Sequence, residues 1–98
     1  MQVVYKNNKL ESICTKASVA ERKYDRRMAE KIQERIDQIS SFPTVEMLIR
    51  FKVGGCHALT GDRKGQFAMD LVQPFRLIFT SAAQDIRVAR ILEIVDYH

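Results

Sequence analysis

The chain has 98 residues, of which 46% are hydrophobic and 29% charged, an ordinary composition for a globular protein. This length predicts a single domain over residues 1–98 with one modest core and little room for an enclosed substrate cavity, so any active site should be a surface groove. Sixteen Lys and Arg against 12 Asp and Glu give a net charge of +4, which suits a polyanionic partner but is well short of a histone-like tail.

The cysteines and the apolar runs limit the class of protein further. Cys14 and Cys56 lie far apart without a CxxC pair, and no His/Cys cluster has zinc spacing. We therefore expect no metal site, no disulfide framework and no cofactor, and two small buried thiols without a redox role. No run approaches the roughly 18 apolar residues that cross a bilayer, and the N-terminus lacks a long apolar segment. We expect a cytoplasmic protein without a membrane partner.

The N-terminal half predicts a strand followed by helices. Val3-Val4-Tyr5 is a β-prone run that stops at Asn7-Asn8, either of which could cap a helix that enters residues 9–13. A gap in the apolar pattern between Val19 and Tyr24 predicts a break between two further helices. The helical stripe recurs every three to five residues as Val19, Tyr24, Met28, Ile32, Ile36 and Ile39. Pro43 ends this pattern, and a short helix over 45–49 is expected before Gly54-Gly55.

The C-terminal half predicts four strands, over residues 56–60, 66–72, 75–81 and 86–95, separated by short turns. In the third of these, Phe75, Leu77 and Phe79 alternate with Arg76, Ile78 and Thr80, so one face of the sheet can carry the core. The expected fold class is α+β, with N-terminal helices packed on one face of a twisted antiparallel sheet. We expect the opposite face to be free for function.

Three motifs in this half carry a resemblance to a known family. Residues 56–68, CHALTGDRKGQFA, resemble the strand–turn–strand signature of HigB-like plasmid maintenance killer proteins of the RelE/ParE toxin superfamily. The resemblance continues through residues 74–79, PFRLIF, and ends on residues 94–98, IVDYH. The N-terminal half matches only in pattern. The family often has an Arg shortly before the motif His, where this chain has Gly54, Gly55 and Cys56.

The resemblance implies a RelE-like fold and a metal-independent endoribonuclease that cuts messenger RNA in the A site of the translating ribosome. It also implies a cognate antitoxin, in this branch a HigA-like helix-turn-helix protein, so operator DNA would be contacted only through the antitoxin. One alternative is a ParE-like poison of DNA gyrase, which shares the fold and performs no hydrolysis. Another is a degenerate relative retained only as part of a transcription-regulating complex.

Metal-free RNA cleavage needs a base for the 2′-hydroxyl proton, an acid for the leaving 5′-oxygen, and cations for the charge on the phosphate. The resemblance assigns the catalytic roles to His57, Arg76, Asp96, Tyr97 and His98. Either histidine could be base or acid, because imidazole titrates near neutrality. Asp96 could be a base or orient an imidazole, and Tyr97 could donate a proton or stack on an unpaired base. Arg76 is predicted to stabilise the transition state, although a cross-strand pair with a residue such as Asp70 is an equal alternative.

Four further cations are predicted to bind phosphate. Arg63 and Lys64 lie in the turn of the motif, where flexible cations add salt-dependent affinity, and an ordinary solvated turn is the alternative interpretation. Arg50 and Lys52 could extend this patch towards ribosomal RNA.

Overall fold

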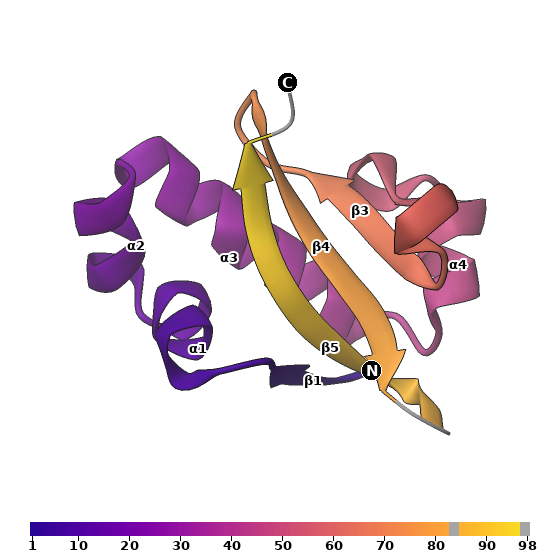
Figure 1. Ribbon diagram of the computed structural model, residues 1–98. Coiled ribbons are helices and arrows are strands. Elements are labelled where there is room, and N and C mark those ends of the chain that lie inside the picture. The colour runs from indigo at the N-terminus through magenta and orange to yellow at the C-terminus, as the bar shows by residue number, and fades with distance from the viewer. Residues whose placement is uncertain (83–84, 97–98) are drawn as a thin grey trace.

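The computed structural model describes residues 1–82 and 85–96 (Figure 1). Within these residues four α-helices pack on one face of a five-stranded sheet with the strand order β1-β5-β4-β3-β2. None of these helices is long and apolar enough to cross a membrane. In chain order the elements are β1 Gln2–Tyr5, α1 Asn8–Thr15, α2 Ala17–Lys23, α3 Arg26–Ser41, α4 Val45–Arg50, β2 His57–Ala58, β3 Gln66–Asp70, β4 Phe75–Ala82 and β5 Asp85–Asp96.

Side-chain caps explain where the first and third helices begin. Asn7 caps α1, because its side-chain oxygen accepts a hydrogen bond from the Leu10 amide at 2.8 Å. Asp25 caps α3 in the same way, accepting from the Met28 amide at 2.7 Å. The predicted break after Val19 is confirmed, since α2 ends at Lys23 and α3 begins at Arg26.

The core lies between α3 and the sheet, and Figure 1 shows α3 running behind β4 and β5. The predicted apolar stripe of α3 supplies one side of this core, and alternate residues of the central strands supply the other. Replacing one of these large side chains by alanine costs about 2–5 kcal/mol in comparable cores. The residues with at most 2% exposure that meet here are Met28, Ile32, Ile39, Met69, Leu77, Phe79 and Ile91.

The sheet is mixed, so the expectation of an antiparallel sheet is wrong for one pair of strands. Strands β2 to β5 pair antiparallel, whereas β1 lies parallel to β5, with Val3 opposite Ala89. Parallel neighbours need a long connection, and here the rest of the fold lies between the two strands in the sequence. A strand of four residues such as β1 contains no signal in its sequence for the strand beside which it lies.

The helix-free face of the sheet carries two rows of paired residues. One row contains His57, Ala68, Ile78 and Glu93, and the next contains Asp70, Arg76 and Val95. The centre of this face is less free than expected, because Ala68 and Ile78 are fully buried. Arg63 spans it from the turn after β2, donating to Glu93 on β5 at 3.1 Å.

Candidate active site

His57 lies at the start of β2, with an exposed side chain. Its Nδ1 is 2.9 Å from the carbonyl oxygen of Gly55. A carbonyl oxygen only accepts hydrogen bonds, so Nδ1 carries the proton and donates, and Nε2 of the neutral ring is the nitrogen with a lone pair. The geometry therefore fixes the tautomer in which Nε2 can take a proton from a substrate.

The turn before His57 requires glycine. Lys52, Gly54 and Gly55 all have left-handed backbone angles, with φ of 51°, 56° and 68°. A β-carbon on Gly54 would lie 2.6 Å from Nε of Arg35, and one on Gly55 would overlap the carboxylate of Asp70. Gly54 and Gly55 therefore let the side chains of Arg35 and Asp70 approach the backbone.

Arg76 pairs with Asp70 across neighbouring strands. The two residues are opposite each other in the β3–β4 register, and Nε of Arg76 lies 3.4 Å from Oδ1 of Asp70. The two side chains are 30% and 40% exposed, so the pair is half-buried at the surface. The cross-strand pair considered from the sequence is therefore present. That Arg76 also stabilises a phosphate stays a prediction.

Asp70 is also fixed from the helix side of the sheet. Nε of Arg35 on α3 donates to the main-chain oxygen of Asp70 at 2.6 Å, and its Nη1 donates to the side chain of Gln38 at 3.0 Å. Sequence reasoning considered Asp70 only as a possible partner of Arg76 and did not place Gly55 or Arg35 in the site. The Gly54-Gly55 pair beside the motif His could have indicated a close approach to the backbone, but it was interpreted only as a break in the chain.

The structure brings His57 and Arg76 to one face but does not bring Asp96 there. Asp96 is opposite Phe75, whose ring packs against the core on the helix side of the sheet. The cause is an irregularity in the β4–β5 register after Ile78, which changes the face on which the later residues of β5 lie. Tyr97 and His98 lie outside the described residues.

The predicted phosphate-binding cations differ in their surroundings. Arg63 donates from Nη1 to the side chains of Gln66 at 3.0 Å and Glu93 at 3.1 Å, so it braces the turn against the sheet. Lys64 is exposed beside it. Arg50 and Lys52 are exposed at the end of α4, where the Arg50 guanidinium lies 5.9 Å from the centre of the Phe51 ring. We therefore expect Lys64, rather than Arg63, to be the phosphate ligand in the turn.

Cys56, although it precedes His57, does not provide a nucleophile. Its side chain is buried, and burial raises the pKa of the thiol to about 12. The thiolate is the reactive form of cysteine, so at neutral pH this residue is inert. The adjacent Cys and His thus do not form a thiolate–imidazole pair.

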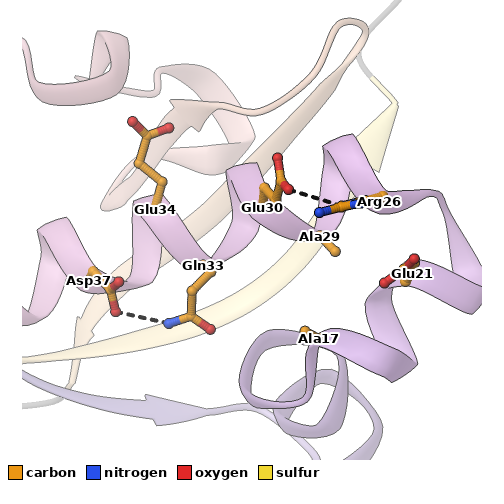
Figure 2. Close-up of a pocket in the computed structure, with 8 residues that line it drawn as sticks. All are labelled: Ala17, Glu21, Arg26, Ala29, Glu30, Gln33, Glu34 and Asp37. Carbon is orange, nitrogen blue, oxygen red and sulfur yellow. Dashed lines mark hydrogen bonds and ion pairs between the residues drawn. The ribbon is translucent and has the colours of Figure 1, made fainter.

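A groove of about 530 Å³ on the helical side of the molecule is lined mainly by acidic side chains (Figure 2). It runs between α2 and α3 over the small side chains of Ala17 and Ala29. Its charged lining is mostly acidic, and a hydrogen bond from Lys31 lowers the pKa of Glu34, which keeps that carboxyl ionised. The negative carboxylates of the groove repel the negative phosphates of RNA, so the candidate RNA surface is the helix-free face of the sheet. The carboxylates of the groove are Glu21, Glu30, Glu34 and Asp37.

Helices on one face of a mixed five-stranded sheet form an arrangement that is similar to solved structures of bacterial toxins. The YoeB/ParE toxin from Agrobacterium tumefaciens superposes with a TM-score of 0.70 at 16% identity over the whole of both chains. A chain of the YoeB-YefM complex from Staphylococcus aureus gives 0.66 at 17% identity, covering this chain entirely and 97% of that chain. The YoeB dimer from the same organism gives 0.65 at 18% identity with the same coverage.

No protein-family model matches the sequence, and no curated protein matches it either. At these identities the likeness to solved structures is one of fold. The expected RelE-like α+β fold is thereby confirmed, and membership of the HigB-like branch stays a prediction.

Proposed function

We propose that this chain is the toxin of a toxin–antitoxin pair and that it cleaves messenger RNA on the translating ribosome. The observation that carries the proposal is the placement of His57 and Arg76 on the helix-free face of a toxin-type fold. His57 presents Nε2 as a proton acceptor, and Arg76, two strands away, supplies positive charge on the same face. A protein with a net charge of +4 suits an RNA substrate.

The reaction that fits these groups is attack by a ribose 2′-hydroxyl on the adjacent phosphorus. Nε2 of His57 takes the hydroxyl proton as the new O–P bond forms, and Arg76 stabilises the additional charge on the phosphate oxygens. The bond to the 5′-oxygen breaks and that oxygen receives a proton, which leaves a 2′,3′-cyclic phosphate and a 5′-hydroxyl. Tyr97 and His98 stay the predicted sources of this second proton, whereas Asp96 lies on the other side of the sheet.

The partners we propose are a cognate antitoxin and the ribosome with its A-site message. YoeB, one of the structures with this fold, was solved as a toxin–antitoxin complex with YefM. That the antitoxin here is a HigA-like helix-turn-helix protein, and that it alone contacts operator DNA, stays an expectation from the sequence motifs.

The test is induced expression in bacteria with mapping of message ends. Wild type should arrest growth and produce new 5′-hydroxyl ends within translated messages. His57→Ala should abolish cleavage and Arg76→Ala should slow it to a low rate that single-turnover measurements still detect, whereas Arg27→Ala, which removes an exposed arginine from α3, should cleave like wild type. Growth arrest with intact messages would contradict the nuclease proposal, and gyrase-dependent DNA breaks would then indicate a ParE-like poison.

A further inference from the structure

Gly55 contacts both His57 and Asp70, and Asp70 is the carboxylate that pairs with Arg76. The carbonyl of Gly55 accepts the hydrogen bond from Nδ1 of His57 at 2.9 Å. The α-carbon of Gly55 lies against Oδ2 of Asp70, where a β-carbon would overlap that oxygen. The other carboxylate oxygen, Oδ1, is the one paired with Nε of Arg76 at 3.4 Å. A continuous set of contacts therefore joins His57 to Arg76 through Gly55 and Asp70.

We propose that Asp70 is a positioning residue for RNA cleavage, holding the Arg76 guanidinium in the orientation that meets the reacting phosphate, and that Gly55 makes the space this requires beside His57. The inference rests on the proposed function. An arginine side chain has many rotamers, and pairing at Nε selects the direction of the guanidinium plane before the substrate binds. Asp70 acts only through Arg76 and touches no substrate.

The position of Asp70 is itself tightly defined. Its main-chain oxygen accepts from Nε of Arg35 at 2.6 Å, and the next amide, that of Leu71, donates to the carbonyl of Phe75 at 3.1 Å. The backbone from which the carboxylate extends is thus held on both sides. From this fixed position the carboxylate attracts the guanidinium as an ion pair at 3.4 Å, without a hydrogen bond to Nε, and so orients Arg76 by charge.

Charge supports a functional role over a purely structural one. A carboxylate on a surface that binds RNA weakens the binding by repulsion, which disfavours Asp70 at this place. A half-exposed ion pair stabilises a fold only slightly, so stability offers little compensation. Neither RNA affinity nor the stability of the fold explains a carboxylate at this position, whereas the need to orient Arg76 does.

The experiment is single-turnover cleavage of a ribosome-bound message by purified protein. Asp70→Asn should lower the rate constant at saturating ribosomes about 100-fold, because misplacing a reacting group has an effect of this order. The half-saturating ribosome concentration should not rise and should fall by less than about threefold, since Asp70 makes no contact with RNA and its replacement removes only a weak repulsion. Asp37→Asn, which removes the same charge from the exposed surface of α3, should match wild type.

A second pair of measurements separates positioning from a general loss of structure. In an Arg76→Ala background, the additional Asp70→Asn change should have no further effect on the rate constant. The positioning role would be overturned if Asp70→Asn had the same rate constant as Asp37→Asn. It would also be overturned if Asp70→Asn lowered the rate constant as much in the Arg76→Ala background as in wild type. Either result would leave the proposed function standing. A wild-type chain that cleaves no ribosome-bound message would overturn the proposed function itself.

Discussion

Replacing Gly55 by alanine should destabilise the protein more than the same replacement at Gly61, although the two residues have almost the same backbone conformation. Their φ angles are +68° and +65°. Alanine in this left-handed region costs roughly 1–2 kcal/mol, so that part of the loss is common to both variants. At Gly61 nothing lies within 4 Å of the added β-carbon, whereas at Gly55 the carboxylate of Asp70 occupies its place.

The additional loss of stability at Gly55 arises because Asp70 must give up its ion pair with Arg76. To make space, the carboxylate has to turn away from Arg76, whose Nε it meets at 3.4 Å. A partly exposed ion pair contributes roughly 0.5–1 kcal/mol, and crowding of the surrounding atoms adds about 1 kcal/mol. We expect a loss of roughly 2–4 kcal/mol for Gly55→Ala and roughly 1–2 kcal/mol for Gly61→Ala. Each kcal/mol lowers the Tm by about 4–8 °C in a domain of this size.

The assay is urea unfolding followed by far-ultraviolet circular dichroism, with Asp70→Ala added to each glycine variant. Without the carboxylate, the free energy lost by Gly55→Ala should fall to that lost by Gly61→Ala. Equal losses in the two single variants, or a loss at Gly55 that Asp70→Ala leaves unchanged, would refute the contact between Gly55 and Asp70 as the cause.

Two other predictions follow from the surroundings of the thiols and of the turn. Burial raises the pKa of Cys14 and Cys56 from 9.0 to about 12, so the unfolded chain loses these protons first and the free energy of unfolding should fall as pH rises between about 9 and 12. Urea titrations at several pH values measure this decrease. A thiol reagent at pH 8 should modify both cysteines only in denaturant, and rapid modification of the folded protein would contradict their burial. Lys64→Ala should reduce the salt dependence of ribosome binding by about one unit of slope, because an exposed cation releases a counterion on binding. Arg63→Ala should reduce it less, since Glu93 already pairs with Arg63 at 3.1 Å, and equal slopes would contradict that difference.

The fold was predictable because its local and long-range signals agree. The apolar spacing of α3, the caps at Asn7 and Asp25, and the alternation in β4 each indicate the element that forms, and together they predict helices on one sheet face. The parallel pairing of β1 was not predictable, because it depends on which strand edge remains available after the rest of the sheet has formed.

The site was predictable only in part. His57 and Arg76 follow from motif residues on strands, and simple alternation places Arg76 opposite the core. Alternation fails for Asp96, because an irregular register after Ile78 shifts the later part of β5 to the other face. Asp70 could not be identified from its own surroundings in the sequence, since its role depends on a contact with Gly55 that only the folded chain creates.

The measurement that tests the central claim most directly compares two copies of one message in a purified translation system, one with its start codon intact and one with it removed. The account predicts that the purified chain cleaves only the translated copy, at sites in register with the codons, and that His57→Ala leaves both copies intact. Equal cleavage of the two copies, or cleavage by His57→Ala at the wild-type rate, would contradict it.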